Sequence, residues 1–120
     1  MQITKLDGQE IAIVSGGEIV IEDVQSALDL MATVQYETDC NRFVIHKSMI
    51  SEDFFDLKTR LAGDILQKFV NYRVKMAIVG DYSGYDSRSL RDFIYECNHG
   101  SDFFFVSTQQ EAIERLSGLK

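Results

Sequence analysis

Three loops are candidates for a ligand site, and two polar segments among them, 46–51 and 80–87, hold most of the side chains that could bind a ligand or carry out chemistry; the third is Ser107-Thr108. A histidine and a carboxylate can exchange protons with a substrate, and an arginine beside the free N–H groups of a helix start can hold an anion. Both segments follow predicted buried strands, and parallel α/β sheets bind ligands beyond the carboxyl ends of their strands. The residues predicted to bind a partner protein or a small anionic ligand are His46, Ser48, Asp81, Tyr82, Tyr85 and Arg88.

Each of these residues also has a purely structural interpretation. A single histidine at a strand end usually makes a structural hydrogen bond, and Ser48 lies outside the Gly-Xaa-Ser-Xaa-Gly motif of a serine nucleophile. Asp86 or Ser87 can cap a helix and leave Arg88 in solvent, because the spacing of 80–87 matches no phosphate-binding loop. We therefore assign no catalytic residue.

The cysteines give no metal-binding pattern. Cys40 and Cys97 are far apart and form no CxxC motif, which favours two reduced thiols over a redox or zinc site. Cys97 lies on the apolar side of a predicted helix and should be inert, whereas Cys40 lies in a polar loop and is the more reactive candidate. No metal and no cofactor is expected.

Hydrophobic periodicity predicts strands and helices that alternate along the chain. Asp7-Gly8 separates two β-prone runs and favours a hairpin with a type I′ turn. Ser51 is predicted to cap a long helix that continues to residue 69, and Thr108 to open the last helix with a capping box. The predicted strands are 2–6, 9–14, 42–46, 74–79 and 103–106, and the predicted helices are 22–34, 51–69, 90–97 and the segment after 108.

This order, ββαβαβαβα, predicts an α/β fold with a mostly parallel five-stranded sheet flanked by helices. The N-terminal hairpin adds one antiparallel strand. The helix predicted from Ser51 is apolar on two sides, so it should cover the sheet and a second surface, either another helix or a subunit partner. Phe54, Phe55 and Tyr72 are candidates for that interface, with core packing as the alternative, and a homo-oligomer is expected.

The composition is that of an ordinary globular protein. The chain has 120 residues, 45% of them apolar and 26% charged, and one domain spanning 1–120 is expected. A net charge of −7 argues against nucleic acid and against an anionic membrane surface as partners. No segment is long and apolar enough to span a membrane, and no secretory signal is recognised, so a cytoplasmic location is expected.

Four segments resemble a bacterial family that is classed only as a domain of unknown function. Their sequences are FDLKT (55–59), LAGDILQKF (61–69), VKMAIVGD (74–81) and SLRDFIYE (89–96), and the resemblance covers nearly the whole chain. More remotely, the element order is similar to that of STAS domains, the anti-sigma-factor antagonist fold. This similarity implies a non-catalytic regulatory module that binds a protein or a small ligand. Segment 46–51 lacks the Asp-Ser-Xaa-Gly pattern of the phosphorylated serine in those regulators, so regulation by phosphorylation is not expected.

Two functions are consistent with these residues. The preferred hypothesis is a non-enzymatic binding or regulatory domain, because the sequence contains no recognisable catalytic motif. The alternative is a small enzyme, a hydrolase or transferase, that acts on a phosphorylated metabolite through the loops at the carboxyl ends of the strands. His46 would then work with Asp81 and Arg88, which requires the three side chains to reach one substrate.

Overall fold

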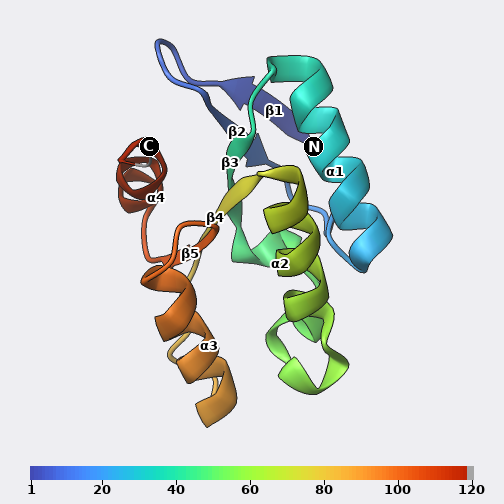
Figure 1. Ribbon diagram of the computed structural model, residues 1–120, viewed down its shortest axis with the longest axis vertical. Coiled ribbons are helices and arrows are strands. Elements are labelled where there is room, and N and C mark those ends of the chain that lie inside the picture. The colour runs from blue at the N-terminus through green and yellow to red at the C-terminus, as the bar shows by residue number, and fades with distance from the viewer. Residues whose placement is uncertain (119–120) are drawn as a thin grey trace.

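The computed structural model describes residues 1–118 and shows an α/β structure with one five-stranded mixed sheet (Figure 1). The strands lie side by side in chain order, with β1 antiparallel to β2 and the other pairs parallel. This confirms the predicted α/β class and the predicted order of strands and helices. The elements are β1 (Gln2–Lys5), β2 (Ile11–Ser15), α1 (Val24–Thr38), β3 (Arg42–His46), α2 (Leu61–Tyr72), β4 (Lys75–Val79), α3 (Arg88–Asn98), β5 (Phe103–Val106) and α4 (Gln109–Ser117).

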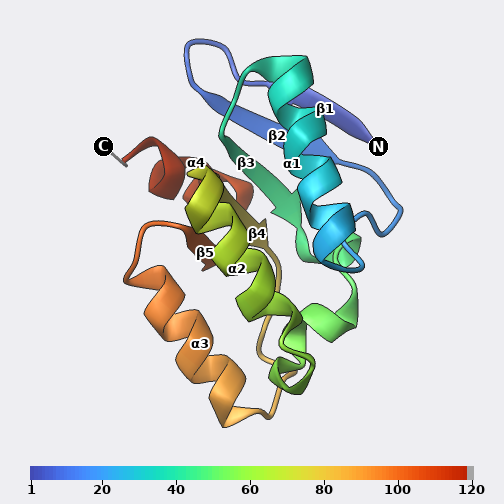
Figure 2. The same cartoon turned by 45° about the vertical axis from the view of Figure 1, so that its right-hand side comes forward.

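The helices lie on two sides of the sheet. α1, α2 and α3 each connect two neighbouring parallel strands, and such crossovers turn in the same hand, so all three cover one face. α4 follows the last strand and packs on the opposite face (Figure 1, Figure 2). The sheet is therefore the middle of three layers.

The central strands are buried on both faces, so their side chains alternate between two cores. In β3, Phe43 and Ile45 belong to the core under α1, α2 and α3, and Val44 belongs to the core under α4. β5 repeats this pattern with Phe103 and Phe105 on one face and Phe104 on the other.

α4 covers only part of its face. A helix is about 10 Å wide and neighbouring strands are about 4.8 Å apart, so one helix covers about two strands. α4 packs mainly over β4 and its neighbours β3 and β5 and reaches β2 less, with Ala112 and Leu116 buried in this core. Ile13 of β2 and Val79 of β4 remain half-buried on the same face, at the side that α4 leaves open.

The predicted hairpin is confirmed, but its turn differs from the prediction. Gly8 has φ +71°, and the described non-glycine residues with positive φ do not include Asp7. A type I′ turn needs positive φ at both central residues, so that prediction is wrong. The Leu6 N–H donates to the Ile11 carbonyl at 3.0 Å, and the loop therefore includes residues 7–10.

The predicted long helix from Ser51 to residue 69 is wrong in its first half. The chain makes two 3₁₀ turns, Glu52–Phe55 and Leu57–Thr59, before α2 begins at Leu61. Ser51 caps the first of these turns by accepting a hydrogen bond from the Asp53 N–H.

Local hydrogen bonds explain this break. The Thr59 hydroxyl donates to the carbonyls of Asp53 and Asp56, at 2.7 and 2.8 Å, and the Asp56 carboxylate accepts from the Lys58 N–H at 3.2 Å. Such bonds compete with the backbone pattern of an α-helix. Arg60 then adopts a left-handed conformation with φ 64°, which starts α2 in a new direction.

The structure corrects two further predictions, the interface role of Phe54 and Phe55 and the exposure of Cys40. Phe54 and Phe55 are 0% and 3% exposed, so they pack in the core, and only Tyr72 of the three interface candidates is exposed. Cys40 was predicted to lie in a reactive polar loop, but it is 1% exposed. The chain turns back toward the core at Asp39, which has φ 59° and ends α1.

Arg60→Gly should raise the free energy of unfolding by about 0.5–1 kcal/mol, because a residue with a Cβ is strained at positive φ and glycine is not. Urea denaturation measures the change. The matched control is Lys58→Gly, which lies in the preceding 3₁₀ turn without positive φ and should lower the free energy of unfolding. A destabilised Arg60→Gly variant would contradict the strain at this position.

Candidate functional site

A pocket of about 430 Å³ lies at the carboxyl ends of β2, β3 and β4. It occupies the part of the face that α4 leaves open, and the first residue of α4 helps to line it. His46 and Val79, the last residues of β3 and β4, are paired in the sheet and bring both strand ends to the pocket. The lining includes the apolar residues Ile13, Val44, Met49 and Val79 and the polar residues His46, Ser48 and Gln109.

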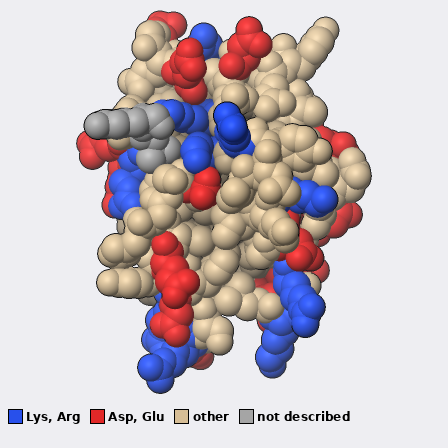
Figure 3. Space-filling view, viewed as in Figure 1, with Lys and Arg blue, Asp and Glu red and all other residues tan. Residues whose placement is uncertain are grey.

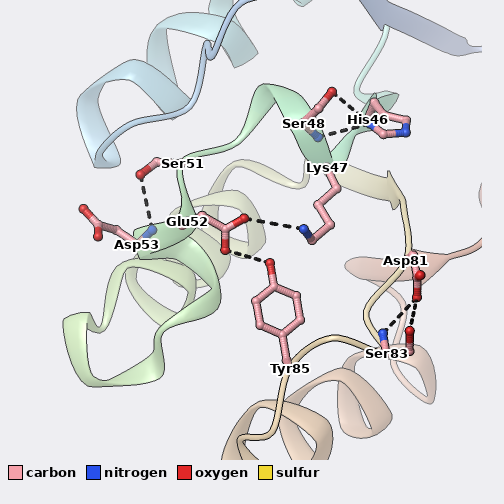
Figure 4. Close-up of polar contacts among 9 residues, drawn as sticks. All are labelled: His46, Lys47, Ser48, Ser51, Glu52, Asp53, Asp81, Ser83 and Tyr85. Carbon is pink, nitrogen blue, oxygen red and sulfur yellow. Dashed lines mark hydrogen bonds and ion pairs between the residues drawn. The ribbon is translucent and has the colours of Figure 1, made fainter.

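His46 and Ser48 are brought together by a tight turn at the end of β3. The Ser48 N–H donates to His46 Nδ1 at 3.1 Å, and the Ser48 Oγ lies 2.9 Å from the same nitrogen. Because Nδ1 accepts from a backbone N–H, the proton of the neutral ring is on Nε2. In Figure 4 this second nitrogen faces away from Ser48, so it is free to contact a ligand.

The same geometry bears on catalysis. A hydroxyl 2.9 Å from an imidazole nitrogen is within the range of a nucleophile and its base. However, the lone pair of Nδ1 already accepts the Ser48 N–H, and no carboxylate of residues 1–118 makes a hydrogen bond to the ring. The pair therefore fits a turn cap better than the first two members of a catalytic triad.

Lys47 connects the two polar segments that the sequence singled out. Its Nζ lies 3.5 Å from Glu52 Oε1, and the Tyr85 hydroxyl donates to Glu52 Oε2 at 2.8 Å (Figure 4). The ammonium also lies over the stacked rings of Phe55 and Tyr85, 5.2 and 4.9 Å from their centroids. A cation over two aromatic faces is favourable, especially when partly desolvated.

Gly80 allows Lys47 to reach this position. A Cβ at residue 80 would lie 2.6 Å from the Lys47 Cβ, so the stem of the lysine fills the space that another residue would need. A hydrogen-bonding interaction with the Tyr85 hydroxyl raises the pKa of Lys47 above its ordinary value, and the charge of Glu52 raises it further. Burial acts in the opposite direction but is outweighed. Burial raises the pKa of Tyr85. At neutral pH the group therefore contains a protonated Lys47 and a neutral Tyr85 phenol.

Lys47 and Glu52 are the residues that the sequence analysis missed. Lys47 lies between the candidate residues His46 and Ser48, but its sequence context did not indicate a functional role, since an isolated lysine in a loop is usually solvated. Glu52 and Tyr85 are 33 positions apart, and only the folded chain brings them together.

Asp81 and Arg88 do not join His46. The Asp81 carboxylate accepts hydrogen bonds from the hydroxyl and the N–H of Ser83, at 2.7 and 2.9 Å, and these bonds lower its pKa. Ser87 caps α3 by accepting from the Leu90 N–H, and Arg88 is exposed in the first turn of this helix. Within residues 1–118, no hydrogen bond connects His46 with Asp81 or Arg88.

Tyr82 has a structural position. Its hydroxyl donates to the Ile78 carbonyl at 2.6 Å, and its ring packs edge-on against Phe105. Burial raises the pKa of Tyr82 well above the ordinary value of a phenol. Tyr82 and Tyr85, both predicted to bind a partner or ligand, are half-buried because their rings pack against Phe105 and Phe55.

Other kinds of site find little support in the part of the chain that is described. No group of three or more His, Cys, Asp or Glu side chains among residues 1–118 is arranged to hold a metal ion. Burial raises the pKa of Cys97 to about 11, which fits the predicted inert thiol. No described helix has the length and the apolar character to cross a bilayer.

The fold and the pocket define an α/β protein with a mixed five-stranded sheet and a cavity at the carboxyl ends of its parallel strands. Residues 6–116 match the model of a family described as a domain of unknown function, DUF4180, and the chain belongs to this family. No curated protein and no solved structure matches it significantly. The matched residues include the whole lining of the pocket.

The folded protein should lose stability as the pH rises above about 9. The pKa values of Cys97, Lys47, Tyr82 and Tyr85 lie above the ordinary 9.0 of a thiol, 10.5 of a lysine and 10.0 of a tyrosine, so the folded state retains protons that the unfolded chain releases. Stability that is complete below about pH 9 is then lost as the pH rises through the folded pKa values. Urea denaturation over a series of pH values measures this decline.

Tyr82→Phe removes the more deeply buried phenol and should flatten this decline. It should also lower the free energy of unfolding by about 1 kcal/mol at neutral pH, through the lost hydrogen bond to Ile78. Tyr36→Phe, at a tyrosine that is 92% exposed, is the matched control and should behave as the wild type. An unchanged decline in Tyr82→Phe would show that Tyr82 ionises as easily in the folded state as in the unfolded chain.

Proposed function

We propose that the chain is a non-catalytic binding module with a regulatory role, and that its ligand occupies the pocket beside His46. The observation that carries this proposal is the pocket of about 430 Å³, with apolar walls and a few polar groups. Ligand sites usually have this composition, because apolar contacts provide affinity and a small number of polar groups fix orientation. The position beyond the carboxyl ends of parallel strands supports the same assignment.

The lining favours a ligand with an apolar body and a polar head group. Ile13, Val44 and Val79 offer apolar contact, and the Nε2–H of His46 offers a hydrogen-bond donor. Gln109 opens α4, where unpaired N–H groups and the helix dipole favour negative charge. A small anionic molecule or an anionic side chain of a partner protein therefore fits the pocket best.

The regulatory role rests on element order. The sequential sheet with a leading antiparallel strand and intervening helices is similar to the order expected for an anti-sigma-factor antagonist domain, and this analogy alone suggests regulation through binding. A bacterial origin, a cytoplasmic location and self-association belong to the same proposal. Acidic and basic side chains are interspersed on the face drawn in Figure 3, which supports a partner other than nucleic acid.

A hydrolase or transferase is the second candidate. The 2.9 Å separation of Ser48 Oγ and His46 Nδ1 favours it, because a base at this distance can take the proton of an attacking hydroxyl. The substrate would be a phosphorylated metabolite, held by the donors of the pocket. Binding remains the preferred function because the ring nitrogen that would act as base already accepts the Ser48 N–H.

A thermal-shift screen against small anions, phosphorylated metabolites and nucleotides should identify compounds that stabilise the wild type. At about 100 times its Kd, a ligand adds about 2.7 kcal/mol of stability, which raises the melting temperature by several degrees. His46→Ala removes the donor from the pocket and should abolish this shift. Chemical shifts of the Ile13, Val44 and Val79 methyl groups should change on titration of the same compound.

His99→Ala provides the matched control, because His99 packs against Tyr95 at the end of α3 and does not line the pocket. It should keep the full shift. A ligand that stabilises His46→Ala as strongly as the wild type would place the binding site elsewhere. Consumption of the ligand, lost in Ser48→Ala, would support the enzyme instead.

A further inference from the structure

β5 forms one edge of the sheet, and its residues make that edge open to association. The strand consists of Phe103–Val106, four apolar residues that are all buried. An uncharged, apolar edge strand is a template for pairing with another chain, and proteins usually protect such edges with charged side chains or covering elements. β5 has no outward charged side chain for this purpose.

The backbone of β5 shows which groups face the open edge. The Met76 N–H donates to the Asp102 carbonyl, and the Gly80 N–H donates to the Val106 carbonyl. In a parallel pair, alternate residues direct their N–H and C=O groups to the same neighbour. Residues 102, 104 and 106 therefore face β4, and Phe103 and Phe105 direct their backbone groups outward.

Asn98 occupies the place of the next strand at Phe105. Its Nδ2 donates to the Phe105 carbonyl at 3.1 Å, and its Oδ1 accepts from the Phe105 N–H at 2.8 Å. A side-chain amide has the same donor and acceptor as a peptide group, so one residue satisfies both outward groups of Phe105. Only this orientation of the amide allows both bonds.

Asn98 is also fixed from its other side. It is the last residue of α3, and its carbonyl accepts a hydrogen bond from Arg115 of α4. The Arg115 guanidinium lies over the ring of Phe104, 4.6 Å from the centroid. Asn98 thus connects helices on opposite faces of the sheet, directly at its edge.

We propose that Asn98 closes the β5 edge and prevents a second copy of the chain from pairing with it. Two β5 edges related by a two-fold axis present the same groups to each other, so the contact is self-complementary. Antiparallel pairing would give the outward groups of Phe103 and Phe105 new partners and join the sheets of two molecules. The proposal is independent of the pocket and its ligand.

Asn98→Ala and Asn98→Asp separate edge protection from general destabilisation. The alanine removes both bonds and adds no charge to the edge. The aspartate keeps an acceptor for the Phe105 N–H, loses the donor to the carbonyl, and places a charge at the edge that repels a second copy. Asn71→Ala, at an exposed asparagine near the end of α2, is the matched control.

Light scattering after size exclusion over a range of concentrations measures the mass of each variant, and hydrogen exchange measures local opening at the Phe105 amide.

Asn98→Ala should exchange the Phe105 amide about tenfold faster than the wild type and should gain mass as its concentration rises. Asn98→Asp should also open faster, but should keep the wild-type mass, and Asn71→Ala should match the wild type in both measurements. Equal association of the alanine and aspartate variants would show that destabilisation drives it and would overturn the proposal. Wild-type mass and exchange in Asn98→Ala would overturn it as well.

The wild type offers a test that needs no variant. Phe103 and Phe105 both direct their N–H groups to the open edge, but Asn98 accepts only from Phe105. The Phe105 amide should therefore exchange more slowly than the Phe103 amide. Equal exchange of the two would show that Asn98 does not close the edge in solution.

Discussion

The structure depends on the burial of the parallel strands from both sides. Side chains alternate along a strand, so β3, β4 and β5 need apolar residues at their buried central positions and a helical layer on each face. Phe43 and Val44 are neighbours in sequence but lie in different cores. A shift of one residue in register would exchange the two faces of a strand. The sequential strand order places α1, α2 and α3 together, and leaves α4 to cover the other face alone.

The candidate site follows from this imbalance. Three helices cover one face and one short helix covers the other, so the sheet is incompletely covered near β2. Where that open surface meets the carboxyl ends of the strands, the chain supplies His46 and Ser48 from a tight turn and Gln109 from the start of α4. Lys47 lies in this same turn, between His46 and Ser48. The pocket and the group of Lys47, Glu52 and Tyr85 are therefore adjacent, and both are positioned by the end of β3.

The sequence predicted the elements better than their junctions. The strands, the two terminal helices and the Thr108 cap are confirmed, because their signals are local: apolar periodicity and a hydroxyl that accepts from the Glu111 N–H. The helix from Ser51 was predicted from its apolar stripes, but the hydroxyl of Thr59 and an extended Asp56 interrupt it. Apolar periodicity does not report such competition for backbone groups. Cys40 was misplaced for a related reason, because polar neighbours in sequence do not exclude burial in space.

By itself, the sequence determined the α/β class, the order of the elements, and which loops follow the carboxyl ends of the parallel strands. Those properties follow from short-range patterns and from the rule that parallel strands bring their carboxyl ends to one edge. The tertiary structure alone decided the strand order and the partners of each side chain, such as Glu52 for Tyr85. It also placed Lys47 over two aromatic rings and Asn98 against Phe105. These contacts join residues distant in sequence, and their geometry depends on how the layers pack rather than on any local preference.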